Sequence, residues 1–508
     1  MVFHRLCIPT LLLVAVALSA DWKPQIPKTW DDAAIGTHEI PLADPAGSPK
    51  HVSSEYYYRI PVRPIFKSYP VYAPGHEPPG YLEWLKQREP VIIWDDKGRT
   101  PHLRTEEDWR RAGEIVFDAP ITFSSPALVQ ADVRNPAWYE KLRIPVPKSG
   151  ILSEYQYVIR TKGVIEVGSI SCANCHSRVM PDGSVLKGAQ STFPVSRAAA
   201  WAFRAAAAAA PDKGKHLAQL RGFLNQLHGA PWIRPNMQAR IDGMSLEEIA
   251  SVFEAVPPGA SLRTRGNSFL PIQIPDLIGL KDRLYLDRTG LETHRGIGDL
   301  MRYAAMNQGG DSLASFAGFI PADIPRFSEL PPPETRRRYS DEQLYALALW
   351  LYSLKPPPNP NRFGALAARG QKVFEREQCG QCHTPPLYTN NKLTPAKGFK
   401  VPPEHRKLYA VMPLSVGTEP DLTLRTRRGT GYYKVPSLKG LWYRGMFPHD
   451  GSCATLEDWF DPRRLRDDYV PTGFKGYGVE KRAVPGHEFG LHLNAEDKAA
   501  LLAFLRTL

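Results

Sequence analysis

A five-residue pattern occurs twice in this chain of 508 residues and constrains its fold more than any other feature. The pattern is Cys-x-x-Cys-His, and its two copies occupy residues 172–176 and 379–383. The chain has only 6 Cys and 14 His, so a random arrangement would contain about 0.002 copies. Chance therefore does not explain two copies, and together they contain four of the six cysteines.

The spacing of the pattern has a chemical reason. Two thiols three positions apart can each form a thioether bond to a vinyl group of one haem, and the adjacent histidine reaches the iron. A thioredoxin-like redox pair, a zinc site and a disulfide framework are the alternatives, and they leave the repeated histidine unexplained. We therefore expect two covalently attached c-type haems. Cys172, Cys175, Cys379 and Cys382 would form the thioether bonds, and His176 and His383 would be iron ligands.

The start of the chain has the form of an export signal. Arg5 precedes an almost wholly apolar stretch, residues 6–18, and small residues follow at 17–20. Residues 1–19 are therefore predicted to be a signal peptide, which implies a periplasmic or secreted protein. A retained anchor is the alternative, but the stretch is short for a bilayer, and no later segment has 18 uninterrupted apolar residues.

Composition narrows the class of partner. The 64 Lys and Arg outnumber the 52 Asp and Glu and give a net charge of +12, which favours acidic partners. No basic run or nucleic-acid motif accompanies this charge, so nucleic-acid binding is not expected. The remaining cysteine outside the leader, Cys453, is expected to be a small buried residue rather than a reactive thiol.

Two predicted helices divide the chain. Residues 340–343 form a capping box before a helical apolar stripe, and Asn494 can cap a similar helix at the end of the chain. Each of these helices follows one haem motif. The 49 prolines concentrate in the N-terminal part and in residues 356–360, which read as a stiff linker between domains.

The last segment resembles the small helical cytochrome c fold. It has a leading Gly-x-x-x-Phe helix around Gly370, the second motif and a closing amphipathic helix, and the glycine would let another helix approach closely. The first haem region matches less well, because a predicted strand at residues 155–160 precedes its motif and no leading helix is evident. An alanine-rich helix at 196–210 and a capping box at 245–248 follow.

We therefore expect a mainly α protein with two cytochrome c-like helical haem domains, long irregular loops and short strands. The predicted divisions are a signal peptide (1–19), a Pro-rich wrapping extension (20–150), an expanded first haem domain (151–355), a linker (356–361) and a second cytochrome c domain (362–508).

Motifs in the last domain carry a closer resemblance. The stretches 435–440 (VPSLKG), 447–452 (FPHDGS) and 454–457 (ATLE) are similar to the bacterial di-haem cytochrome c peroxidase superfamily. The long N-terminal extension and residues 485–490 (PGHEFG) resemble the rubber-oxygenase branch of that superfamily.

The resemblance implies that the two haems have different roles. The haem on His176 would meet peroxide or oxygen at an open position, and the haem on His383 would be six-coordinate and relay electrons. The implied sixth ligand is His487, with His449 as the alternative and Met412, Met446 and His492 behind them.

The chemistry of the first haem stays open. The Phe-Trp-Asp-Gly-Arg stretch of the peroxidases is not present, so no catalytic residue is assigned; Phe316, Phe319 and His294 are the candidates for the distal pocket. The expected function is an oxidoreductase, peroxidase-like or oxygenase-like, supplied by a small redox protein and acting on peroxide, oxygen or an organic substrate. The alternative is a non-catalytic electron-transfer cytochrome with both irons six-coordinate, for which His294 could close the first iron.

Overall fold

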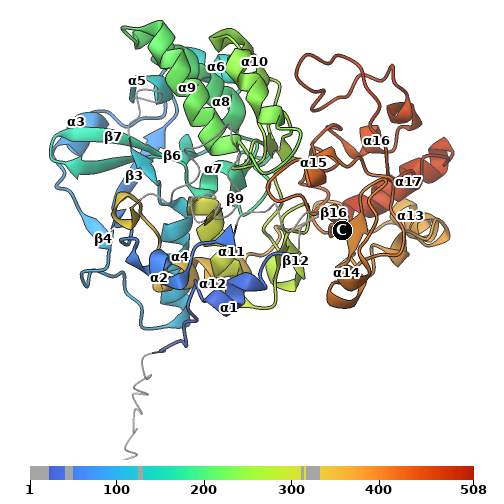
Figure 1. The fold of residues 1–508 in the computed structure, drawn as a ribbon. Helices are drawn as coiled ribbons and strands as arrows, with labels where there is room; N and C mark the ends of the chain where they lie inside the picture. The colour runs from blue at the N-terminus through green and yellow to red at the C-terminus, as the bar shows by residue number, and fades with distance from the viewer. Residues whose placement is uncertain (1–21, 41–49, 124–129, 310–313, 316–331) are drawn as a thin grey trace, which may run out of the picture.

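A computed structural model describes residues 22–40, 50–123, 130–309, 314–315 and 332–508 of the chain (Figure 1). The predicted signal peptide and the candidates Phe316 and Phe319 lie outside these residues. The residues before the Pro-rich linker form a larger first part, which contains a four-stranded sheet and most of the helices. The residues after the linker form a smaller second part at the right of the view. Within the described residues, no helix is both long and apolar enough to cross a membrane.

The first part contains a four-stranded antiparallel sheet, so it is less purely α-helical than expected. The strands lie in the order β3-β6-β7-β5 and comprise β3 (Ser68–Tyr72), β6 (Ile151–Thr161), β7 (Val164–Ser169) and β5 (Thr122–Phe123). The predicted strand at 155–160 is confirmed as part of β6. A tight turn at Gly163, whose φ is +82°, joins β6 to β7 and leads the chain toward the first haem motif.

Three helices cover one end of the first part, at the top of Figure 1. They are α8 (Val195–Ala209), α9 (Lys213–His228) and α10 (Leu246–Glu254). α8 confirms the alanine-rich helix, and the Ser245 hydroxyl accepts from the Glu248 amide at the start of α10, as the capping box predicts.

Short elements make up most of the remainder. The shorter helices are α1 (Asp32–Gly36), α2 (Ser54–Arg59), α3 (Tyr81–Lys86), α5 (Gln130–Val133), α6 (Pro136–Leu142), α14 (Pro403–Leu408), α15 (Asp421–Leu424) and α16 (Leu456–Trp459), and α11 (Ile297–Gly309) is longer. The two-stranded pairs are β1 (Lys50–His51) with β14 (Ala314–Ser315), β2 (Ile65–Phe66) with β4 (Ile92–Trp94), β8 (Ser177–Val179) with β9 (Val185–Lys187), β10 (Ala260–Ser261) with β11 (Ile272–Gln273), β12 (Tyr285–Leu286) with β13 (Glu292–Thr293), and β15 (Leu393–Pro395) with β16 (Tyr432–Lys434).

A close helix crossing organises the second part. Helix α13 (Ala365–Arg376) packs against the closing helix α17 (Ala495–Arg506), which Asn494 caps as predicted. At the crossing, a Cβ on Gly370 would lie 1.9 Å from the Ala500 carbonyl oxygen. Any larger residue would force the two backbones apart, so this glycine is required by the packing.

The same crossing occurs in the first part, where sequence analysis found no leading helix. Helix α4 (Glu106–Asp118) packs against α12 (Asp341–Ser353), and a Cβ on Gly113 would lie 2.0 Å from the Ala346 carbonyl oxygen. Both leading helices carry the segment Gly-x-x-Val-Phe, beginning at Gly113 and Gly370. The stretch at 20–150, expected to be a wrapping extension, therefore also supplies α4, which packs against α12 as α13 packs against α17.

The crossing makes a stability prediction. Gly370→Ala should lower the free energy of unfolding by about 1–3 kcal/mol, because the new methyl group meets backbone that can move only with its helix. Gly36→Ala, at the exposed end of α1 where a Cβ meets nothing within 4 Å, is the control. Thermal unfolding followed by far-UV circular dichroism compares them, and equal melting temperatures would contradict the packing argument.

A buried charge network ties the N-terminal segment to the rest of the molecule. His38 is 0% exposed and lies between two carboxylates, with Nε2 3.2 Å from Glu292 and Nδ1 3.6 Å from Asp299. Next to it, Glu39 pairs with Arg428 of the second part at 2.8 Å. Burial alone would lower the pKa of His38, but Asp299 and Glu292 outweigh it and raise the pKa to about 9.

This network predicts a loss of stability in alkaline solution. The folded state holds a proton on His38 that the unfolded chain, with a pKa near 6.5, releases first. The stabilisation is therefore complete below about pH 6.5 and disappears as the pH rises through about 9. The free energy of unfolding should fall by a few kcal/mol between pH 6 and pH 9.5. His38→Gln should flatten this dependence, and an unchanged pH profile in urea titrations would contradict the assignment.

Candidate haem sites

The second motif follows its leading helix almost directly. Gln378, with φ of +57°, turns the chain out of α13 into a short 3-10 turn at Cys379–Gln381. Cys379 and Cys382 are free thiols and half-buried, and His383 is buried. The turn therefore places both sulfurs and one imidazole close to the end of α13.

His487 faces His383. The centroids of the two imidazole rings are 6.2 Å apart, and the ring planes are tilted by 58°. Two imidazoles that coordinate one metal from opposite sides, through bonds of about 2 Å, hold their centroids roughly 6 Å apart. The pair thus fits the axial ligands of one iron, with the two cysteines of the motif beside it.

The protonation of this pair suits metal binding. Burial lowers the pKa of His383 to about 4 and that of His487 to about 3, so both imidazoles are neutral near pH 7. The Nδ1–H group of His383 donates to the Tyr388 carbonyl over 3.2 Å, and the backbone of Pro436 lies beside the same ring. A ligating histidine commonly orients its ring through such a bond, which leaves Nε2 free for iron.

A buried arginine holds the loop that carries His487. Arg464 is 0% exposed, and its guanidinium donates to the carbonyl oxygens of Gly486 and His487 at 2.9 and 2.8 Å. It also stacks on Trp459, 4.1 Å from the ring centroid, and Trp459 in turn lies 5.5 Å from the His487 ring. His487 has a φ of +50°, a left-handed conformation that these contacts stabilise.

The other proposed sixth ligands are placed differently. His449 is buried, and its Nε2–H donates to the Glu419 carboxylate over 2.6 Å; the charges around it raise its pKa despite burial. His492 is exposed, and Met412 has its sulfur 4.0 Å from the Cys382 sulfur, on the side of the motif itself. Met446 packs against Gly259 and Gly473. Of the five candidates, His487 is the one whose ring faces His383.

The first motif forms the short helix α7 (Cys172–His176), which begins where the Ser171 amide donates to Asn174 over 2.7 Å. Burial lowers the pKa of His176 to about 4, and the backbone of Pro275 lies beside its ring. The arrangement repeats that of His383 beside Pro436, so each motif histidine is oriented by a proline loop from far along the chain.

These two proline loops have the same sequence pattern, which the sequence analysis missed. Residues 275–283 and 436–444 both read Pro-x-Leu-x-Gly-Leu-x-x-Arg. The central glycines, Gly279 and Gly440, both have φ above +70°. An internal comparison of the two halves would have found this repeat and paired each loop with its haem motif.

His294, proposed for the distal side of the first haem, has both ring nitrogens engaged. Nδ1 lies 2.6 Å from the Arg283 carbonyl oxygen, and Nε2 lies 2.6 Å from the Tyr352 hydroxyl. In this arrangement neither nitrogen is free to bind iron. Among the histidines of the described segments, none stacks against His176 in the way that His487 faces His383.

The alternatives to haem find no matching geometry. All five cysteines of the described residues are free, and within these residues no three or more His, Cys, Asp or Glu side chains converge on a possible metal position. The two Cys-x-x-Cys pairs therefore do not form one four-cysteine zinc site. Cys453 is buried, as expected, and burial raises the pKa of its thiol to about 12.

Comparison with known proteins adds little to this geometry. No family model and no curated protein sequence matches the chain. Among solved structures, the chain is similar to hydrazine synthase from Kuenenia stuttgartiensis. The two are 17% identical over 59% of this chain and 89% of that one, with a TM-score of 0.28. A MauG-like protein associated with microbial copper homeostasis is similar at 18% identity over 33% and 56%, with a TM-score of 0.22.

The diheme peroxidase BthA from Burkholderia thailandensis is similar at 18% identity over 65% of this chain and 92% of that one, with a TM-score of 0.22. Likenesses this weak carry no argument about function. The haem assignment depends on the motifs and on the contacts of this chain.

The contacts of Arg464 make a prediction for the haem-loaded protein. Arg464→Gln should weaken iron binding by His487 roughly tenfold or more, because three of its bonds hold the carbonyl groups of Val484, Gly486 and His487 itself. Electron paramagnetic resonance should then show a high-spin ferric signal that the unaltered haem lacks. The neighbouring Arg463→Gln is the control, since Arg463 is exposed and pairs only with Asp461. Equal spectra for the two variants would exclude a positioning role.

Proposed function

We propose that this chain is an exported di-haem c-type cytochrome with redox activity toward peroxide or oxygen. The observation that carries the proposal is the facing pair His383 and His487, 6.2 Å apart between ring centroids, directly beside a Cys-x-x-Cys-His motif. The family resemblance of the motifs supports the same assignment, and the other copy of the Cys-x-x-Cys-His pattern, at residues 172–176, supports a second haem.

The two sites are proposed to do different work. His383 and His487 would together hold one iron, which would suit electron relay and would leave no position for a substrate. The iron on His176 would keep one position open, which reduction or activation of peroxide or oxygen requires. Both ring nitrogens of His294 are hydrogen-bonded, to the Arg283 carbonyl and the Tyr352 hydroxyl, which supports an open position at this iron.

The protein supplies attachment, orientation and a dry environment to this chemistry. The four motif cysteines would hold the haems covalently, and Tyr388 and Pro436 orient His383 while Pro275 lies beside His176. Electrons would come from a small redox protein, for which the net charge of +12 favours an acidic docking surface.

The experiment begins with the mass of the purified protein, matured in a host that attaches c-type haem. Two haems should add about 1.2 kDa to the mature chain. Electron paramagnetic resonance should then show one low-spin and one high-spin ferric haem, and the high-spin signal alone should respond to peroxide. Two low-spin haems with no response to peroxide or oxygen would instead support a non-catalytic electron-transfer cytochrome.

Two variants test the ligand assignment. His487→Ala should convert the relay haem to a high-spin spectrum, because it removes the imidazole facing His383. His449→Ala is the matched control and should leave that haem low-spin, since His449 is paired with Glu419. The opposite result would move the sixth ligand to His449.

A further inference from the structure

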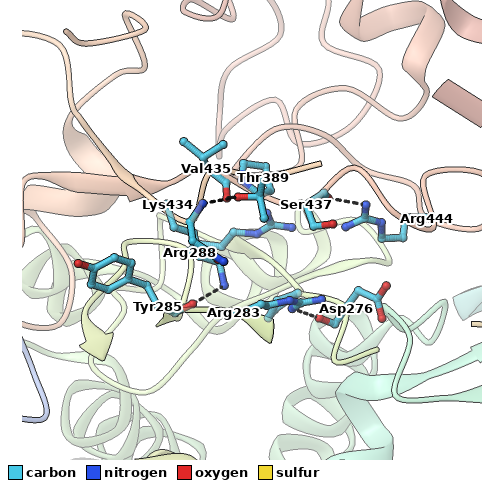
Figure 2. A pocket seen from close by; sticks show the side chains of 12 residues that line it. Asp276, Arg283, Tyr285, Arg288, Thr389, Lys434, Val435, Ser437 and Arg444 are labelled. Carbon is cyan, nitrogen blue, oxygen red and sulfur yellow. Dashed lines mark hydrogen bonds between the residues drawn. The ribbon is translucent and has the colours of Figure 1, made fainter. Parts of the chain in front are cut away.

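A small cavity of about 20 Å³ lies where the two parts of the chain meet. Figure 2 shows its lining from both sides: Asp276, Arg283 and Tyr285 come from the first part, and Thr389, Lys434, Ser437 and Arg444 from the second. Both proline loops reach it, because Pro275 and Pro436 line it as well. The cavity is therefore bounded by the two loops that lie beside the two motif histidines.

The lining carries an excess of positive charge. Four of its side chains are cationic, namely Arg283, Arg288, Lys434 and Arg444, and Asp276 is its one carboxylate. Asp276 is already engaged, since one oxygen accepts from the Tyr443 hydroxyl at 2.7 Å and the other from the Ile278 amide at 3.0 Å. Arg178 also lies near it, so Asp276 does not neutralise the four cations.

Within the described residues, the hydrogen-bond acceptors of the four cations are neutral backbone oxygens. Arg283 donates to the Asp276 and Ile278 carbonyls, Lys434 to that of Tyr285 at 3.4 Å, and Arg444 to that of Ser437 at 2.8 Å. Arg288 has only a long contact of 3.5 Å to the Gln273 carbonyl. Four cations held together in this way repel one another.

All four cations are half-buried, which makes this arrangement costly without a counter-charge. Desolvation and the neighbouring arginines lower the pKa of Lys434 well below its usual range and that of Arg288 to about 9. Buried charges in proteins are normally paired, because an isolated one costs several kcal/mol. The cavity is thus built for anions, and its flat guanidinium groups match carboxylates in particular.

The position of the cavity indicates which carboxylates these are. Pro275 and Pro436, which line the cavity, also lie beside the rings of His176 and His383. Arg283 and Arg444, at the ends of the same two loops, line the cavity next to them. We propose that Arg283, Arg288, Lys434 and Arg444 form one shared site that binds propionate carboxylates of both haems. The inference rests on the proposed function, since it requires a haem at each motif.

The shared site would couple the two haems electrostatically. A cation beside a haem carboxylate stabilises the reduced form, because it offsets the electron that reduction adds. Removing one of the central cations should therefore lower the reduction potential of both haems. A site that serves one haem would affect only that haem.

Lys434→Met and Arg288→Met are the variants for the test. Methionine suits the buried position of Lys434 because it is unbranched and apolar. Lys439→Met is the control, since Lys439 lies exposed in the same loop as Pro436. Far-UV circular dichroism and the haem mass verify that each variant folds and carries two haems. A missing haem mass in the unaltered protein would overturn the proposed function and this inference with it, whereas intact haem mass with unchanged potentials would overturn the shared site alone.

Optical redox titration gives the readout. At a fixed applied potential, the ratio of reduced to oxidised haem should fall about tenfold at both haems in each central variant, which corresponds to about 59 mV. Lys439→Met should leave both ratios unchanged. A change at one haem only, or at neither, would overturn the shared site although haem attachment is intact.

A free anion is the other source of a carboxylate, and titration with acetate distinguishes it. If the haem propionates fill the site, added acetate should change neither potential beyond the general effect of the same concentration of a chloride salt. A saturable shift with acetate that Lys434→Met abolishes would show that the cavity binds free anions, and the propionate assignment would be wrong. A charge-conserving Arg288→Lys variant should retain most of the potential of the unaltered protein, which separates charge from packing.

Discussion

The close crossing of two helices is the constraint on which each haem region depends. In both crossings a glycine lets a leading helix touch the backbone of a closing helix, at Gly113 with Ala346 and at Gly370 with Ala500. Because these contacts are between backbones, they fix the distance and angle of the helices more tightly than side-chain packing would. The haem motif of the second part then emerges from a fixed point, only two residues beyond the end of α13.

The two parts contain the same four elements, but the distances along the sequence between these elements differ. Each has a Gly-x-x-Val-Phe helix, a Cys-x-x-Cys-His motif, a Pro-x-Leu-x-Gly-Leu-x-x-Arg loop and a closing helix. In the first part the strands β5, β6 and β7 and two short helices stand between the leading helix and the motif. The leading helix is thereby removed from its motif along the chain but not from its partner α12 in space.

Local signals predicted much of this fold, and long-range contacts explain what they left out. The caps at Ser245, Ser340 and Asn494 and the close approach at Gly370 follow from residues within one helical turn or face, and all are confirmed. Helix α4 was missed although Thr105 and Asp108 form a capping box at its start and Gly113 begins a Gly-x-x-Val-Phe segment, because its partner α12 lies more than two hundred residues later. Arg464 looks in the sequence like its exposed neighbour Arg463, and only the folded loop reveals that it is buried against His487. The cationic cavity is likewise assembled from segments on both sides of the linker, so no local pattern could indicate it.

The ion pair between Glu39 and Arg428 has a consequence for the order in which the molecule completes itself. Synthesis proceeds from the N-terminus, so the segment 22–40 exists long before its partners at Glu292, Asp299 and Arg428. Until those partners arrive, His38 lacks both of its carboxylates and Glu39 has only His51 beside it, so burying the two residues is unfavourable. Segment 22–40 is therefore made early but buried late, and a chain that stops short of Arg428 would leave this segment exposed to proteases and chaperones.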